Sequence, residues 1–180
     1  GFGIETDLRD FKNKIVISHD PASGKEIEFK KLLTDYENKK YSNFLALNIK
    51  SDGIQQEAYS LIKKFKIKRY AFFDQSVPEL FHCHSLGSNY LSRLSDIEPH
   101  MHLYDNSYGV WVDSFEEFRT DVQIFDKILD DGKILCFVSP ELHGRPYMEV
   151  WKWIHNFNKI RNARVAICTD HPLEAEVFFK

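Results

Sequence analysis

The residues with the clearest chemical potential lie near the start of the chain, in the stretch GFGIETDLRDFKNKIVISHDP. Glu5 and Asp7 are two residues apart in a run that predicts a strand, so both side chains are expected on one face. Two carboxylates on one face can hold a divalent cation, which prefers oxygen ligands. The polar outer face of an edge strand explains the same spacing, and the pattern alone does not separate the two interpretations.

Two further candidates follow the next apolar runs. His19 closes the run KIVISH ahead of Asp-Pro, where an imidazole can act as a general acid or base near neutral pH. Asn48 and Lys50 end the run FLALNIK with the same two-residue spacing, and could offer an oxygen ligand and a cation for a phosphate. A histidine in a turn and a lysine closing a strand are the ordinary alternatives.

Other polar clusters carry less information. The histidines in FHCHSLG (81–87) and EPHMH (98–102) do not have the spacing of known zinc sites. Glu141, His143 and Asp170 directly follow apolar runs, where α/β folds build their sites, and are candidates by position only.

The elements that must position these residues alternate along the chain. Eight short apolar runs predict strands, at 3–9, 14–19, 44–50, 69–74, 90–95, 108–113, 133–139 and 164–170. Four segments with apolar residues three or four apart predict helices, around 29–36, 54–65, 122–129 and 148–154. This alternation predicts a parallel sheet with crossover helices, except that four residues between the first two runs favour a hairpin. Both a doubly wound sheet and a barrel fit the pattern.

Composition narrows the class of protein. The chain has 180 residues, 43% of them hydrophobic, and a net charge of −3 with dispersed basic residues, so we expect a folded domain without a nucleic-acid partner. No run reaches the length of a membrane span. Three cysteines, two of them in apolar runs, favour free thiols in a reducing compartment, and we expect a cytoplasmic protein.

Many of the candidate side chains share one position relative to the predicted strands. They stand at or near strand ends, and in a single barrel of parallel strands they would converge at one mouth; they are Glu5, Asp7, His19, Asn48, Lys50, Asp74, Arg93 and Glu141.

The order of motifs resembles the glycerophosphodiester phosphodiesterase family of phospholipase-C-like phosphodiesterases. GIETDL (3–8) and ISHDP (17–21) are similar to that family's Gly-x-Glu-x-Asp and His-Asp-Pro motifs. Asn48-Ile49-Lys50 stands where the family has Glu-x-Lys, and CTDHP (168–172) is similar to its Thr-Asp-Tyr-Pro. The family's His-Arg-Gly motif has no counterpart here, and we expect it upstream of Gly1.

The resemblance implies one compact (β/α)8 barrel of TIM type over residues 1–180, with its first strand and motif missing from the N-terminus. It also implies one divalent cation, Mg²⁺ or Ca²⁺, held by Glu5, Asp7 and Asn48. His19 and Lys50 would be catalytic, with Lys50 also contacting the phosphate of a small-molecule phosphodiester. Arg93 would be a second phosphate contact. Asp74 and Glu141 would bind the alcohol part of the substrate.

Two other functions stay open. One is a barrel that has lost its catalytic activity and binds a phosphorylated sugar or a protein. The missing motif, and Asn48 in place of a glutamate, suggest this function. The other is a related lyase that stops at a cyclic phosphate.

Overall fold

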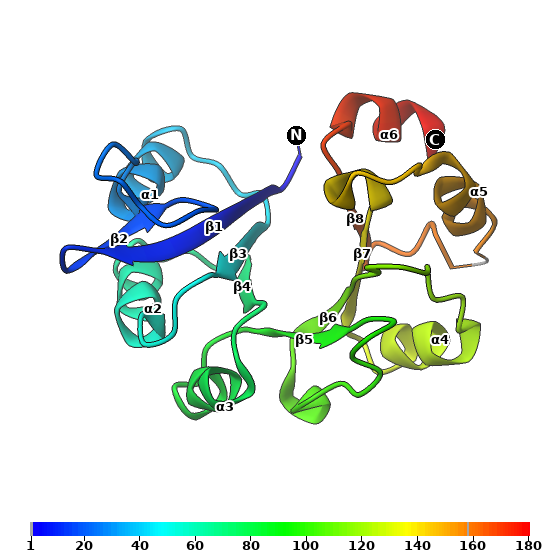
Figure 1. Ribbon diagram of the computed structural model, residues 1–180, viewed down its shortest axis with the longest axis horizontal. Helices are drawn as coiled ribbons and strands as arrows, with labels where there is room; N and C mark the ends of the chain where they lie inside the picture. The colour runs from blue at the N-terminus through cyan, green and yellow to red at the C-terminus, as the bar shows by residue number, and fades with distance from the viewer. Residues whose placement is uncertain (1, 158) are drawn as a thin grey trace. The chain divides into compact units, whose positions relative to one another are not determined.

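The computed structural model describes residues 2–157 and 159–180 (Figure 1). The chain forms two compact units, which meet in the sequence between Leu91 and Ser92. Each unit contains a four-stranded sheet, and each is described by itself below.

The first unit has the strand order β2-β1-β3-β4. Strands β1 (Ile4–Phe11), β3 (Leu45–Ile49) and β4 (Tyr70–Phe73) are parallel, and β2 (Lys14–Ile17) pairs antiparallel with β1. The crossover connections carry helices α1 (Phe29–Asn38) and α2 (Gln55–Lys64), and α3 (Val77–Ser85) follows β4. Every residue of β3 and of β4 is buried, as expected for parallel strands.

The hairpin between β1 and β2 has a local cause. Lys12 and Asn13 both have positive φ, 48° and 60°, which is the backbone of the tight turn that matches the twist of paired strands. The register that results places Leu8 opposite Ile17, so the end of β2 returns to the middle of β1. The predicted hairpin is therefore confirmed, and it brings the segment after β2 beside Asp7.

The second unit has the strand order β5-β6-β7-β8. Its strands are β5 (Leu91–Leu94), β6 (Gly109–Val112), β7 (Ile134–Val138) and β8 (Val165–Cys168), and the pairs β6–β7 and β7–β8 are parallel. Its helices are α4 (Val122–Asp130), α5 (Met148–Asn156) and α6 (Pro172–Phe178), with short 3-10 turns η1 (Tyr104–Asn106) and η2 (Pro140–His143). Phe125 of α4 and Phe137 of β7 pack edge to face in its core, with ring centroids 5.1 Å apart.

All eight predicted strands and all four predicted helices are confirmed, and α3 and α6 are additional. The α/β class with parallel strands and crossover helices is confirmed as well. The strands described pair within two sheets of four, so closure into one eight-stranded barrel and a single domain over 1–180 stay predictions. Within the described residues, no helix combines the length and the apolar character that crossing a membrane requires.

Gly109 offers a test of packing in the second unit. A Cβ at this position would lie closer than 3.0 Å to the Ile134 carbonyl oxygen on the neighbouring strand. We expect Gly109→Ala to lower the free energy of unfolding by about 2–3 kcal/mol, because the strand must move away from its partner. All tryptophans (Trp111, Trp151 and Trp153) belong to this unit, so their fluorescence in a urea titration measures the effect. An unchanged midpoint would contradict the close approach of the two backbones.

Candidate active site

Parallel pairing brings the candidates of the first unit to one level of its sheet. Asp7 of β1 pairs with Asn48 of β3, and Asn48 pairs with Phe73 of β4. Asp74 is the residue after Phe73, so Asp7, Asn48 and Asp74 come from three neighbouring strands at adjacent register positions. The structure thus brings three of the candidate residues together in the first unit.

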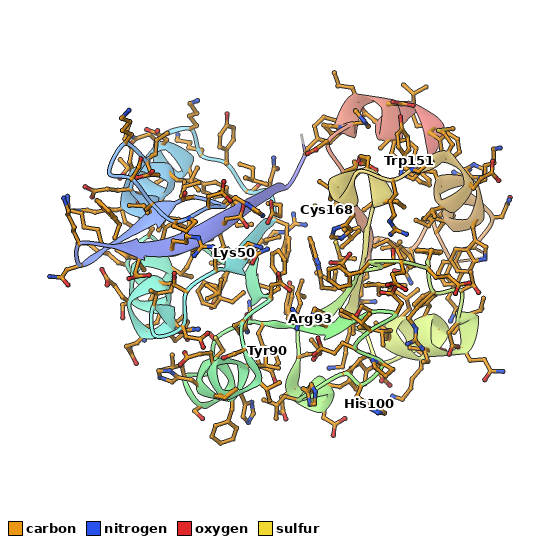
Figure 2. The ribbon with its side chains drawn as sticks, in the orientation of Figure 1. Lys50, Tyr90, Arg93, His100, Trp151 and Cys168 are labelled. Carbon is orange, nitrogen blue, oxygen red and sulfur yellow. The ribbon has the colours of Figure 1, made fainter. Side chains whose placement is uncertain are left out.

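Lys50 lies between two carboxylates of this group. Its Nζ is 3.6 Å from Asp7 Oδ1 and 3.7 Å from Asp74 Oδ2. Figure 2 labels Lys50 just beyond the end of β3. All three side chains are only 19–24% exposed, so their charges are screened less than those of a surface pair. Both distances exceed that of a good hydrogen bond, which leaves the N–H groups of Lys50 able to bind an anion.

Asn48 has one satisfied and one unsatisfied amide atom. Its Nδ2 donates a hydrogen bond to Asp74 Oδ2 at 3.4 Å, which fixes the orientation of the amide. Its Oδ1 is buried and has no hydrogen-bond partner among the described residues. A buried acceptor without a partner costs stability, so this oxygen is suited to a cation or a donor that arrives from outside the chain.

Glu5 has a carboxyl group whose pKa is raised. Burial of the carboxyl among protein atoms, and then the negative charge of Asp7, raise its pKa from 4.5 to about 7. Asp74 acts in the same direction, whereas Lys50 and His19 act against it. The residue as a whole is nevertheless exposed. Burial and the like charges both disfavour the ionised carboxylate, so Glu5 keeps its proton to a higher pH than an isolated glutamate does.

His19 lies close enough to act on the charge of Glu5, although its ring is open to solvent. Its side chain is 75% exposed, and its Nδ1 is 3.0 Å from Asp20 Oδ1. The loop that carries it is tied to β1, because the Ser18 N–H donates to the Asp7 carbonyl at 3.1 Å. The predicted acid–base residue is thus beside the predicted metal ligands, with a ring free to meet a ligand.

The remaining predicted site residues, Arg93 and Glu141, belong to the second unit. Arg93, labelled in Figure 2, donates through Nε to the Glu98 carboxylate. Glu141 accepts hydrogen bonds from the hydroxyl groups of Ser139 and Thr169, and from the Asp170 N–H at 3.2 Å. The carboxylate of Glu141 therefore ties the segment after β7 to the segment after β8.

The second unit also holds an acid–base pair that the sequence only half revealed. His143 Nε2 lies 2.7 Å from Oδ1 of Asp113, which is buried directly after β6. His143 was a candidate by position, but Asp113 was missed. The signal that could have found it is the one used for Asp74, a carboxylate directly after an apolar strand. The Asp170 N–H contact apart, no structural role for the third positional candidate, Asp170, follows from the contacts described.

The donors of the first unit suit a hard cation in type, although their number is small. Among the residues described, no group of three or more His, Cys, Asp or Glu side chains has the arrangement of a metal site. Glu5 and Asp7 supply two carboxylates, and the third oxygen would come from the Asn48 amide, whose Oδ1 is unpartnered. In chemical type these donors fit Mg²⁺ or Ca²⁺, both of which prefer oxygen ligands.

The fold was compared with known proteins. A structure from Galdieria sulphuraria, assigned as a glycerophosphodiester phosphodiesterase, superposes with a TM-score of 0.74 at 17% identity, over 99% of this chain and 85% of that one. A glycerophosphoryl diester phosphodiesterase from Parabacteroides distasonis gives 0.66 at 13% identity, over 98% and 74%. The chain has the fold of glycerophosphodiester phosphodiesterases. The resemblance drawn from its motifs is thereby confirmed at the level of the fold.

Comparison by sequence adds nothing to this likeness, since no protein-family model and no curated protein matches the chain. The glycerophosphodiester phosphodiesterase fold is therefore recognised from its structure and from a few short motifs. In the first unit, the candidate side chains lie on neighbouring strands; they are Glu5, Asp7, Asn48 and Lys50.

Proposed function

We propose that the protein is a metal-dependent phosphoric diester hydrolase that cleaves a small or sugar-linked glycerophosphodiester. The observation that carries the proposal is the arrangement of Lys50 between Asp7 and Asp74, beside the unpartnered Asn48 Oδ1. Acidic oxygen ligands next to a lysine with available N–H groups can bind both a cation and the phosphate that the cation accompanies.

The proposed metal ligands are Glu5, Asp7 and Asn48. The raised pKa of Glu5 supports this role, because a carboxyl crowded by other carboxylates gains more from a cation than an isolated one does. When bound, Mg²⁺ or Ca²⁺ would offset charge on the phosphoryl oxygens. Since Asn48 is neutral, we expect a lower affinity than three carboxylates would give.

The proposed reaction assigns two roles to side chains of the first unit. Lys50 binds a non-bridging phosphoryl oxygen and stabilises the negative charge that grows there in the transition state. The oxygen of water, or of a neighbouring substrate hydroxyl, forms the new bond to phosphorus and releases its proton to solvent. His19 in its protonated form donates a proton to the oxygen of the leaving alcohol, which departs poorly as an alkoxide, as its bond to phosphorus breaks. The exposure of the His19 ring supports this role, because the ring can reach a substrate without displacing protein atoms.

Three further residues are proposed for substrate recognition. Asp74 is proposed to accept a hydrogen bond from a hydroxyl of the alcohol, and its position beside Lys50 and Asn48 supports this role. Two more roles stay predictions: Arg93 as a second contact to the phosphate, and Glu141 as a residue that binds the alcohol part of the substrate. Each would have to share its charge with its present partners, Glu98 for Arg93 and the Ser139 and Thr169 hydroxyls for Glu141.

Turnover with and without metal tests the proposal. Purified protein treated with EDTA should release glycerol phosphate from glycerophosphocholine or glycerophosphoinositol only after Mg²⁺ or Ca²⁺ is added back. His19→Ala should lower kcat by roughly 10²–10⁴-fold, the usual contribution of a positioned acid or base. His100, which is exposed in the second unit, provides the matched control, and His100→Ala should leave kcat unchanged.

The alternatives give different outcomes in the same assay. Absence of turnover with either cation, combined with saturable binding of a glycerophosphodiester, would replace the hydrolase with a binding module. A cyclic phosphate that persists in phosphorus NMR spectra would replace it with a lyase. Equal losses in His19→Ala and His100→Ala would remove His19 from the mechanism.

A further inference from the structure

Arg9 connects the two segments that carry Lys50 and His19. Its Nε donates a hydrogen bond to the His19 carbonyl oxygen at 2.9 Å, and its Nη1 donates to the Lys50 carbonyl oxygen at 3.3 Å. These two acceptors lie 10 and 41 residues away in the chain, on the loops that follow β2 and β3. A single guanidinium of the central strand β1 therefore holds both loops by their backbone.

The neighbouring backbone bonds show where this link falls. The Ser18 N–H donates to the Asp7 carbonyl at 3.1 Å, and the Lys50 N–H donates to the Leu8 carbonyl at 3.0 Å. These two bonds mark the last backbone ties of each loop to β1. Arg9 adds a side-chain bond to each of these two segments, at the carbonyl of His19, one residue after Ser18, and at the carbonyl of Lys50 itself.

The choice of arginine suits this geometry. Its planar guanidinium offers N–H donors in a fixed fork, so two carbonyl groups in different directions can be bound at once. Lysine at the same position could place its single ammonium on one carbonyl or the other. The guanidinium has no carboxylate partner within the described part of the chain, so both of its recorded bonds are structural ones to backbone.

We propose that Arg9 is a positioning residue for the candidate site, and that it sets the separation of Lys50 and His19. The inference rests on the proposed function, in which Lys50 binds the phosphate and His19 protonates the leaving oxygen. Both groups must meet one phosphodiester, so a shift of either loop misplaces a proton donor or a cation. Misplacement by about 1 Å can cost roughly 10²-fold in rate.

Arg9→Met keeps an unbranched apolar stem and removes the guanidinium together with both bonds. We expect kcat to fall roughly 10- to 100-fold while KM changes less than about threefold, because positioning acts on the transition state. Arg9→Lys should recover only part of the loss. Arg69→Met is the matched control, since Arg69 also donates to a backbone carbonyl, that of Ser42 at 3.4 Å, but ahead of β3 and not after it.

Hydrogen exchange tests Arg9 independently of turnover. In Arg9→Met the Ser18 and Lys50 amides, whose bonds border the link, should exchange at least about tenfold faster, whereas the Leu47 amide within β3 should not change. Unchanged exchange at Ser18 and Lys50, or an equal acceleration at Leu47, would overturn the positioning role. A rise in KM at constant kcat would overturn it as well, since that result means direct contact with substrate.

The two readouts separate the two proposals. Suppose that the wild-type protein shows no turnover but that Arg9→Met selectively accelerates exchange at the Ser18 and Lys50 amides. The proposed hydrolase activity is then wrong, whereas the proposal that Arg9 holds the two loops is supported. If the wild type turns over and Arg9→Met matches it in kcat, the hydrolase stands and the positioning role fails.

Discussion

Replacing Asp7 with asparagine should lower kcat/KM for a glycerophosphodiester by roughly 10²–10³-fold, the largest loss expected from any conservative change in this chain. The substitution keeps the size of the side chain and removes a charge that serves two partners. Asp7 is a proposed ligand of the cation, and its Oδ1 is 3.6 Å from Lys50 Nζ. The affinity for Mg²⁺ or Ca²⁺, measured by isothermal titration calorimetry, should fall together with the rate.

Asp10→Asn is the matched control for this experiment. Asp10 lies on the same strand but on the opposite face, because it is an odd number of residues from Asp7. It is exposed, and its side chain has no recorded contact with Lys50. We expect its rate and its metal affinity to match the wild type. Equal effects of the two substitutions would show that the loss of a negative charge anywhere on the strand, and not the loss of a metal ligand, accounts for the result.

Without metal, the first unit should lose stability as the pH rises from about 4.5 to about 7, the ordinary and the folded-state pKa of Glu5. The pKa is raised on folding, so in this window the folded protein binds more protons than the unfolded chain, and the free energy of unfolding decreases with pH. We expect a decrease of about 1 kcal/mol, well below what the full shift would give, since Glu5 is exposed and solvent screens the charges.

Amide hydrogen exchange in β1 and β3, followed in EDTA over this pH range and corrected for the intrinsic rate, measures the effect in the first unit. Glu5→Gln should remove the pH dependence and should stabilise the unit at pH values above the window. Glu57→Gln, an exposed change in the first turn of α2, is the control. Addition of Mg²⁺ to the wild type should restore stability at high pH. A stability that rises with pH in EDTA would contradict the raised pKa.

Period and spacing were sufficient to predict the eight strands and four of the six helices described. Runs such as FLALNIK and KILCFVS have apolar residues on both faces because parallel strands are covered on both sides, and both contain buried strands. The division at Leu91 could not be predicted. The alternation of strand and helix is the same on both sides of it, with no linker composition to mark the boundary.

The candidate site could be predicted where its residues lie at matching positions in or directly after paired strands. Asp7, Asn48 and Asp74 come together because parallel pairing aligns the strands that carry them, and the sequence shows those strands directly. Arg9 could not be assigned a role in the same way. Its partners are backbone carbonyl groups, which every residue has, and only the turn at Lys12 and Asn13 and the register of β3 decide which of them it meets.

The backbone at Asp74 has a consequence for how this chain can be dissected by mutation. Its φ of 67° is left-handed, a conformation that glycine, asparagine and aspartate adopt readily and that costs most other residues about 1 kcal/mol or more. Alanine scanning would therefore confound two effects at this position, the lost carboxylate and a rearranged turn after β4. Asp74→Asn removes only the charge, and Asp74→Gly removes the side chain without straining the turn. These two substitutions, and not alanine, can therefore separate a role in substrate binding from a role in the backbone conformation.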